Sequence, residues 1–466
     1  MNIDIEEAIE NFRSRSAVYA KNERYYSGNH DLAFATDKFK NAFGSLFREF
    51  ALNLCPAVCD TVRDKLRVTR FSVESPEKQA EDVRSQLMRI WGANRMRIRA
   101  GEIHKEALKC GDAYMFVWPD ANGKAMLYPN RAANCTVTYD DEIPGRVVRA
   151  AKHWRGADKR VRINLFYPYR IEKYISKAAV EGTIPPATEF VPLSELPAVA
   201  GGKNMRTSRG AAESETHRSN IQSTTPAYAG GAAGVVENPY GMVPVFHFYN
   251  NADIGAFGRS ELEAAIPIQD GLNKSMLDML VAMEFAAYRQ RWAAGIEVQF
   301  DEAGHVIAPY TAGVDALWIS QNPDAKFGDF ATANLEQFLK VKDSFRGDIA
   351  SVTGTPLHYF MQNSTRALAS GEALKKAESR FLAKIRDRQE SFGQVWADVM
   401  QFALTVEGTA TTSQLITQWE DPAPMSDKEF LENILLKKQI GLSVDQALIE
   451  VGYGKADVKG MVGFEQ

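Results

Sequence analysis

The chain has 466 residues, of which 45% are hydrophobic and 24% are charged, and its formal net charge at pH 7 is −4. This composition is typical of a folded soluble protein with room for two or three hydrophobic cores, and it excludes a disordered tail. The slightly acidic balance argues against a protein that binds nucleic acid over a broad basic surface.

Secretion and membrane insertion are disfavoured. The first ten residues are acidic and lack the basic and apolar regions of a signal peptide, and the most apolar stretch, 276–288, is short and contains Asp278 and Glu284. We therefore expect neither secretion nor a membrane span. The cysteines are too few and too irregularly spaced for a disulfide framework, which fits a reducing cytoplasm. They are Cys55, Cys59, Cys110 and Cys135.

The first part of the chain, residues 3 to about 110, is predicted to be mainly helical. Pro56 suits the first turn of a helix whose apolar residues recur at every fourth position as far as Leu66. A short strand is expected just after Arg70. Two further helices follow it, and the second of them should end at Gly111.

From Ala113 the apolar period changes to two. Four stretches bounded by turn signals predict an antiparallel meander. They are 113–118, 134–140, 145–155 and 160–175. Residues 197–237 are rich in Ala, Gly, Ser and Thr and have no apolar periodicity, which predicts a mobile insertion.

Two helices around a small insert are predicted next. After a strand at 241–250, a helical run extends from about 259 to 292, with Pro267 dividing it. Its apolar stripe consists of Met276, Leu280, Met283 and Ala287. Residues 293–330 are strand-like and turn-rich, and a second helix is predicted at about 331–352. Its apolar face consists of Leu335, Phe338, Val341, Phe345 and Ile349.

The stretch 351–389 contains the most informative pattern, a loop of small residues that leads directly into a long charged helix. Ser370 is placed to cap this helix, and Glu372 falls in its first turn, where a carboxylate is favoured. About thirty residues of helix would span roughly 45 Å. Its apolar face consists of Leu374, Ala377, Phe381, Ile385, Phe392, Val395, Val399 and Phe402.

Four cations on the long helix are expected to form a solvated or subunit-facing surface, with contact to phosphate as the alternative. They are Arg380, Lys384, Arg386 and Arg388. Towards the C-terminus, S-D-K-E and S-V-D-Q resemble capping boxes that open two short helices at Ser426 and Ser443.

No pattern predicts catalysis, a cofactor or a metal. The G-A-F-G-R-S string departs from the phosphate-loop spacing at Asp253 and Arg259, and Ser260 is expected to cap the helix that follows. Cys55 with Cys59, and His104 with Cys110, make a zinc site conceivable. Buried free thiols are the favoured interpretation. No pair of carboxylates stands out for general acid–base work.

Several strings, taken in order, resemble the portal proteins of tailed double-stranded DNA bacteriophages, in particular the siphophage type common in actinobacterial phages. Together they span nearly the whole chain. The strings are Y-Y-S-G-N-H-D-L (25–32), W-G-A-N with A-L-K-C-G-D-A-Y-M-F-V-W (91–118), G-R-S-E-L with Q-D-G-L-N-K (258–274), and T-G-T-P-L-H-Y-F with S-G-E-A-L-K-K-A-E-S-R-F-L-A-K (353–384).

The resemblance implies an α+β portal-type fold. A wing of helices and antiparallel sheet would be followed by a two-helix stem around a small α/β clip, a tunnel loop, a long wing helix and a helical crown. The implied ranges are 1–258 for the wing with its insertion, 259–292 and 331–352 for the stem helices, 293–330 for the clip, 353–370 for the tunnel loop, 371–406 for the long helix and 407–466 for the crown.

The resemblance also implies a non-enzymatic virion protein without a cofactor, assembled in the host cytoplasm. It would form a ring, a dodecamer, at one capsid vertex, through which double-stranded DNA enters during packaging and leaves during ejection without sequence recognition. The implied partners are the terminase large subunit, then head-completion (adaptor) proteins, and the major capsid and scaffolding proteins, with no membrane. Another phage head or tail subunit, or a hydrolase with an unrecognised site, are the alternatives.

Two sets of site residues follow from the resemblance. The tunnel loop would present short polar groups and one cation to DNA, namely Gln362, Asn363, Ser364, Thr365 and Arg366. The stem would pack within and between subunits through Met276, Leu280, Met283, Phe338, Val341 and Phe345.

Overall fold

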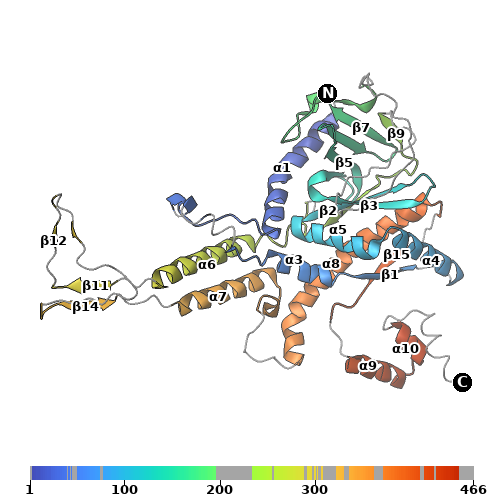
Figure 1. The fold of residues 1–466 in the computed structure, drawn as a ribbon. Helices are drawn as coiled ribbons and strands as arrows, with labels where there is room; N and C mark the ends of the chain where they lie inside the picture. Colours follow the sequence, from blue (N-terminus) through green and yellow to red (C-terminus); the bar gives the residue numbers. More distant parts are fainter. Residues whose placement is uncertain are drawn as a thin grey trace, which may run out of the picture.

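The protein has a mixed α+β body from which two helices project side by side, with short hairpins at their outer end (Figure 1). The structure is a computed structural model. It describes residues 3–38, 40–41, 44, 50–73, 77–195, 234–253, 257–287, 291–295, 299–300, 302, 306–307, 322–329, 335–361, 371–409, 414–423 and 427–450. Within these residues, no helix combines the length and the apolar character needed to span a membrane.

The predicted helical character of the first 110 residues is confirmed. The elements are α1 (Ile3–Tyr26), α3 (Cys55–Asp64), β1 (Val68–Val73), α4 (Glu77–Ala93) and α5 (Met96–Cys110). Pro56 lies in the first turn of α3, and Gly111 ends α5 with a φ of 99°. Asn94 of the W-G-A-N string joins helix to sheet, because its side-chain amide donates to the carbonyl oxygens of Ile90 and Ala125 and accepts from the Leu127 N–H.

The strands after Gly111 form two sheets, so the prediction of a single meander was wrong. The smaller sheet has the order β10-β2-β3 and contains β2 (Asp112–Pro119), β3 (Ala125–Arg131) and β10 (Val245–Tyr249). The larger sheet runs β4-β5-β6-β7-β8, with β9 also paired to β7. Its strands are β4 (Cys135–Tyr139), β5 (Val147–Arg155), β6 (Val161–Phe166), β7 (Arg170–Ser176), β8 (Phe190–Pro192) and β9 (Val235–Glu237).

Prolines explain two of the differences. Pro129 lies within β3, which the sequence analysis did not single out, and β3 tolerates it because it is an edge strand. Pro168 lies in the turn that splits 160–175 into β6 and β7. Residues 196–233, most of the predicted insertion, lie outside the described residues, and its last residues form β9 instead.

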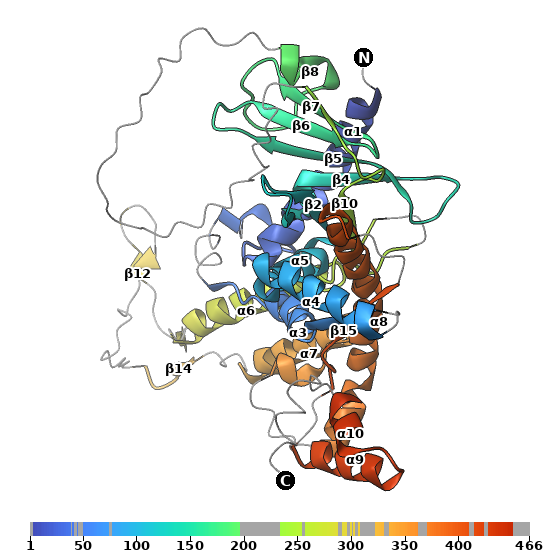
Figure 2. The ribbon, with the colours of Figure 1, turned by 90° about the vertical axis from the view of Figure 1, so that its right-hand side faces the viewer.

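The long helix α8 (Gly371–Val406) lies in the main core of the body. One apolar cluster lies between α1 and the larger sheet, and a second lies between the two sheets. The main core packs α3, α4, α5, the smaller sheet and α8 around Trp396. In Figure 2, α8 extends from the smaller sheet downwards past the helices, and the larger sheet lies above it. With 36 residues α8 fills the predicted range 371–406 and is about 54 Å long, more than the roughly 45 Å expected for about thirty residues.

The predicted apolar face of α8 is buried wherever its side chains are described. The buried residues are Phe381, Ile385, Phe392, Val395, Val399 and Phe402. Ser370 and the side chains of Leu374 and Ala377 lie outside the described part of the chain.

The two projecting helices are α6 (Ile266–Ala287) and α7 (Glu336–Thr353), as predicted. Pro267 does not divide α6: it is the second residue, where a missing N–H costs no helical hydrogen bond. At the outer end β11 (Arg291–Ala294) pairs with β14 (Lys326–Asp329), and β12 (Gln299–Phe300) pairs with β13 (Val306–Ile307). The described part of 293–330 contains strands and no helix.

The C-terminal part contains one strand and two helices. β15 (Leu415–Trp419), which the sequence analysis did not single out, pairs with β1 and lies against α8. α9 (Asp427–Gln439) and α10 (Val444–Glu450) confirm the two predicted helices. The capping box at Ser443 is also confirmed, because its hydroxyl accepts from the Gln446 N–H at 3.2 Å while the Gln446 side chain accepts from the Ser443 N–H. Ser426 lies outside the described residues.

Candidate functional site: the stem and its attachment to the body

We call the two projecting helices α6 and α7 the stem. Their inner halves pack closely against each other. A Cβ atom built on Gly271 would lie 3.1 Å from the ring of Phe345, so the absence of a side chain in α6 makes room for that ring. Phe345 and Met276 both pack on the main core. The structure thus brings together these two of the predicted stem residues.

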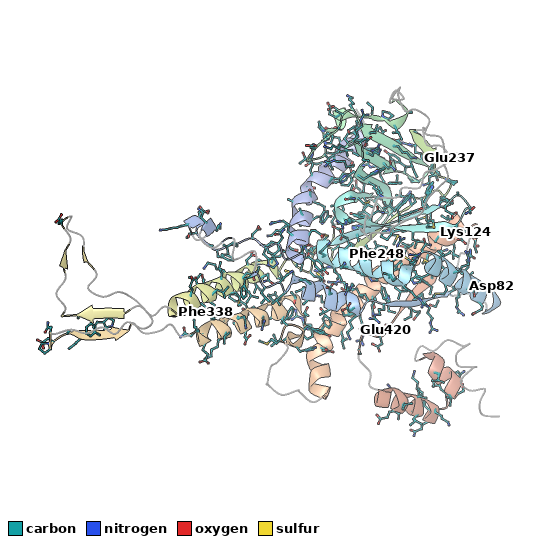
Figure 3. All side chains as sticks on the ribbon, viewed as in Figure 1. Asp82, Lys124, Glu237, Phe248, Phe338 and Glu420 are labelled. Carbon is teal, nitrogen blue, oxygen red and sulfur yellow. The ribbon has the colours of Figure 1, made fainter. Side chains whose placement is uncertain are left out.

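The outer halves of the same helices are only partly covered. Met283 and Val341 are 46% and 41% exposed, although both belong to the predicted packing faces. Leu280 and Phe338 are partly exposed, and Figure 3 shows Phe338 on the outer part of α7, far from the core residue Phe248. A single chain therefore leaves an apolar surface open on the outer half of the stem.

A buried polar cluster fixes the start of α6 to the N-terminal helix. The Tyr25 hydroxyl donates to the Asp270 carboxylate at 2.8 Å, and the Asn273 amide lies 2.7 Å from Nδ1 of His30. The His30 Nε2 atom lies 3.0 Å from the Tyr25 carbonyl oxygen. Burial raises the pKa of Asp270 and lowers the pKa of His30, so the imidazole stays neutral.

A second cluster joins both stem helices to α8. Glu261, just before α6, accepts from Lys384 at 2.6 Å and from Arg388 at 3.1 Å. Lys384 also donates to the carbonyl oxygen of Thr353, the last residue of α7, at 2.8 Å. Burial alone would raise the pKa of Glu261, but the two cations reverse this and hold it below its ordinary value. One ammonium group therefore contacts the chain at the base of each stem helix.

This cluster corrects part of the prediction for the charges of α8. Lys384 and Arg388 are largely buried and paired with Glu261, rather than forming a solvated surface. Arg380 and Arg386 are exposed, as predicted. Spacing along the helix could not separate the two pairs, because the carboxylate they meet lies more than 120 residues away in sequence.

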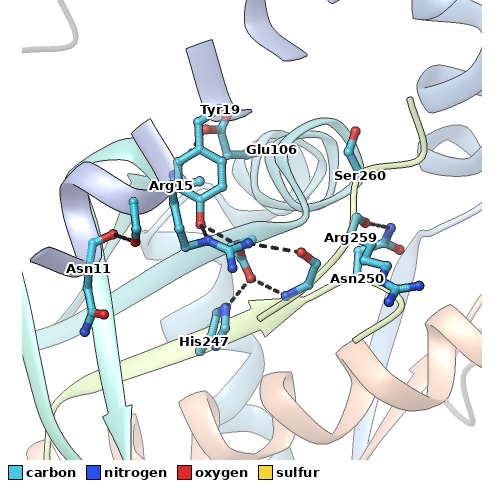
Figure 4. Close-up of polar contacts among 12 residues, drawn as sticks. Asn11, Arg15, Tyr19, Glu106, His247, Asn250, Arg259 and Ser260 are labelled. Atoms are coloured by element: carbon cyan, nitrogen blue, oxygen red, sulfur yellow. Dashed lines mark hydrogen bonds and ion pairs between the residues drawn. The ribbon is translucent and has the colours of Figure 1, made fainter. Parts of the chain in front are cut away.

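A third cluster surrounds Asp112, the first residue of β2, whose side chain is fully buried (Figure 4). One carboxylate oxygen accepts from the imidazole of His247 at 2.8 Å and from the Gly258 N–H at 2.7 Å. The other accepts from the Tyr19 hydroxyl at 2.6 Å and from Arg15 at 2.7 Å. Burial alone would raise the pKa of Asp112, but His247 and Arg15 bring it below its ordinary value.

The Asp112 cluster depends on two glycines that touch. A Cβ on Gly258 would lie 1.9 Å from the carbonyl oxygen of Gly111, and one on Gly111 would lie 2.5 Å from that of Gly258. The G-R-S-E-L segment therefore passes directly over the end of α5, where the Ser260 hydroxyl donates to the Lys109 carbonyl and accepts from the Leu262 N–H. Its glycine serves close packing, and Ser260 caps the turn before α6.

Tyr139, His247 and Asp112 are hydrogen-bonded in a row, as in a proton relay. Their role here is structural. The Tyr139 hydroxyl lies 2.7 Å from His247 Nδ1, and Nε2 contacts Asp112. Both imidazole nitrogens are therefore occupied, and the ring is 1% exposed, so no substrate group can reach it.

The described residues contain one group of side chains that could bind a metal ion, and the ammonium of Lys109 lies against it. Glu23, Glu106 and Cys110 offer ligand atoms within 4.8 Å of one another, but the ammonium of Lys109 pairs with both carboxylates. His104 of the conceivable zinc site accepts a hydrogen bond from the Trp396 indole at 2.8 Å, and burial lowers its pKa to about 3.

The four cysteines are buried free thiols, as favoured from the sequence. Burial raises the pKa of Cys55 and of Cys135 to about 12, so neither is a thiolate at neutral pH.

The predicted tunnel-loop residues, 362–366, lie outside the described residues. The chain before them packs against the body. Phe360 is buried in the main core, and His358 lies 3.2 Å from Glu378 of α8. His358, before the 362–370 segment, therefore contacts the helix that begins at Gly371, directly after it.

The family of the chain follows from comparison with known proteins. A family model described as "Phage portal protein, SPP1 Gp6-like" matches residues 5–452. The chain belongs to this phage portal protein family. The family consists of structural, non-enzymatic proteins of the virion head–tail connector.

Individual relatives share only a modest fraction of identical residues with the chain. The portal proteins of Mycobacterium phages L5 and D29 are each 26% identical over 198 residues, which is 40% of this chain. The match spans about 40% of the length of these curated relatives. Among solved structures, a chain from the neck of an empty GTA particle has a TM-score of 0.44 at 13% identity and covers 89% of this chain and 92% of its own length. A chain from the virion of a native gene transfer agent has the same TM-score at 10% identity, with 98% and 99% covered.

Proposed function

We propose that this portal-family protein assembles into a closed dodecameric ring at one vertex of a phage capsid, with DNA passing through its central channel during packaging and ejection. Family membership supports a head–tail connector role. The observation that carries the ring is the outer stem, where apolar side chains on two adjacent helices stay half exposed in one chain. Neighbouring subunits would cover them.

The parts of the ring follow the predicted ranges. Residues 259–292 and 331–352 form the stem, 353–370 the tunnel loop, and residues beyond 407 the crown, with β15 attached to the body. Thr353, at the start of the tunnel loop, contacts Lys384 of α8, and α8 begins directly after the loop. The polar residues 362–366 would meet the sugar–phosphate backbone without reading bases. Arg366 either contacts phosphate or pairs with a carboxylate of the next subunit.

The clip is the proposed docking site for the terminase large subunit and later for head-completion proteins. Trp292 and Phe327 in the β11–β14 hairpin are 38% and 39% exposed, and aromatic side chains are frequent anchors at protein interfaces. The wing would contact the major capsid and scaffolding proteins.

Native mass spectrometry of the purified chain tests the ring. Twelve copies of a 51.8 kDa chain give 12 × 51.8 kDa, about 620 kDa. Closed rings should also be visible by negative-stain microscopy. A protein that stays monomeric at all concentrations and salts would refute the proposal, whereas a ring of another number would correct only the stoichiometry.

A further inference from the structure

Two short stretches of the chain are strongly basic, although the whole protein has a net charge of −4. Residues 63–70 contain four Lys or Arg residues and one carboxylate, and residues 95–105 contain four Lys or Arg residues and one carboxylate. Together they carry a formal charge of +6, from eight cations and two carboxylates. The near-neutral total therefore conceals a local concentration of positive charge.

The fold places these two stretches side by side. The end of α3 and the start of β1 lie against the first turns of α5, and an open groove of about 620 Å³ runs between them. Arg63, Arg67 and Arg97 line this groove, together with the carboxylates Asp64 and Glu420. We call the cations of 63–70 and 95–105 the arginine ridge.

Most cations of the arginine ridge have no carboxylate partner among the described residues. Among the described residues, two of these cations form ion pairs. Arg63 pairs with neighbouring carboxylates, and the exposed Arg67 lies 3.9 Å from Glu420. Six side chains have no ion pair within 4.0 Å in the described part of the chain: Lys65, which donates to the Pro422 carbonyl oxygen, and Arg70, Arg95, Arg97, Arg99 and Lys105. Their charges are free to attract an anionic partner.

The arginine ridge lies away from the stem. In Figure 1 the stem extends to the left, whereas α4 and the β1–β15 pair lie at the right of the body. Figure 2 views the molecule from that side, with α4, α5 and β15 in front. If the clip turns outward to the terminase, as proposed above, the opposite face turns towards the capsid interior.

We propose that the arginine ridge binds the sugar–phosphate backbone of double-stranded DNA, outside the central channel and without base recognition. This inference rests on the proposed portal function. DNA is favoured over an acidic protein because the ridge offers little apolar surface. Leu66, Trp91 and Met96 at the walls of the groove are buried, and Ile98 is the one exposed large apolar side chain of the two stretches. Protein partners need apolar anchors, whereas phosphates need only cations.

Salt dependence of DNA binding by purified rings tests the arginine ridge. Each phosphate that a cation neutralises adds about 0.9 to the slope of log affinity against log salt. Five contacts would make affinity fall about 500-fold between 50 and 200 mM salt. Replacing both Arg97 and Arg99 with Gln should reduce that fall to about 40-fold. Lys177→Glu, an exposed charge change at the end of β7, is the control and should leave the slope unchanged.

A covalently closed DNA circle separates the arginine ridge from the channel, because it has no end to thread. The circle should compete with a short linear duplex, and the double variant should weaken both. Intact rings whose slope does not change in the double variant, or from which the circle displaces nothing, would overturn the proposal and leave the portal function standing. An acidic peptide that binds as tightly as DNA would overturn it in favour of a protein partner. Failure to form rings would instead refute the portal function.

Discussion

Replacing Lys384 with Met should loosen the attachment of the stem to α8. The Lys384 ammonium lies 2.6 Å from the Glu261 carboxylate and 2.8 Å from the Thr353 carbonyl oxygen, and the side chains of Lys384 and Glu261 are largely buried. Methionine occupies a similar volume and adapts its shape, so the change removes the charge with little effect on packing. Glu261 would keep Arg388, at 3.1 Å, and the side-chain amide of Asn250, at 3.2 Å.

The expected cost follows from the desolvation of the remaining carboxylate. Removing one partner of a buried ion pair costs about 3–5 kcal/mol. Because Arg388 remains, we expect the lower end, about 3 kcal/mol in the free energy of unfolding at pH 7. The pKa of Glu261 is below its ordinary value, so its contribution is present at neutral pH and is lost as the pH falls through that lowered pKa. The difference between wild type and Lys384→Met should therefore shrink below about pH 4.3.

Urea unfolding at several pH values, with hydrogen exchange read at the start of α6 and the end of α7, measures this effect. Arg380→Met is the control, because Arg380 is exposed on the same helix. In Glu261→Gln the Lys384 substitution should cost much less, since the two residues form one pair. The reasoning fails if Lys384→Met costs no more than Arg380→Met, or if its cost is the same at pH 7 and at a pH below the lowered pKa of Glu261.

Three further substitutions test the stem, the glycine contact and the tunnel loop. Leu280→Asp should give monomers or open arcs in native mass spectra, whereas Leu280→Met should keep rings; closed rings of the Asp variant would contradict the stem assignment. Gly258→Ala should lower the thermal midpoint by several degrees, because its Cβ would lie 1.9 Å from the Gly111 carbonyl oxygen; Gly92→Ala, with nothing within 4 Å, is the control, and equal midpoints would show that the contact is not tight. Arg366→Glu should leave rings intact and reduce the DNA packaged per procapsid by a terminase; an unchanged packaging rate would show that this loop does not touch the duplex.

The helices could be predicted because each carries its own signal. The apolar face of α8, the proline in the first turn of α3 and the capping box at Ser443 are local patterns, and the structure confirms all three. The division into two sheets has no such signal. It depends on which strands pair across the insertion: β10 pairs with β2, which precedes it by more than 120 residues.

The buried carboxylates were also invisible in the sequence, for a related reason. Asp112, Glu261 and Asp270 stand in ordinary surroundings along the chain, and their partners come from distant elements. The G-R-S-E-L and G-D-A-Y strings were noticed only as resemblances. The structure gives their reason, since Gly111 and Gly258 touch and Asp112 accepts the Gly258 N–H.

The polar clusters and the apolar outer stem have different roles in the proposed ring. At the base of the stem, every carboxylate of the three clusters already has hydrogen-bonding partners within its own chain, so these groups have little left to offer a neighbouring subunit. The open apolar surface lies further out, at Met283 and Val341. The outer stem, rather than the clusters, would then contribute apolar burial to ring closure, while the clusters fix the angle at which each chain presents it.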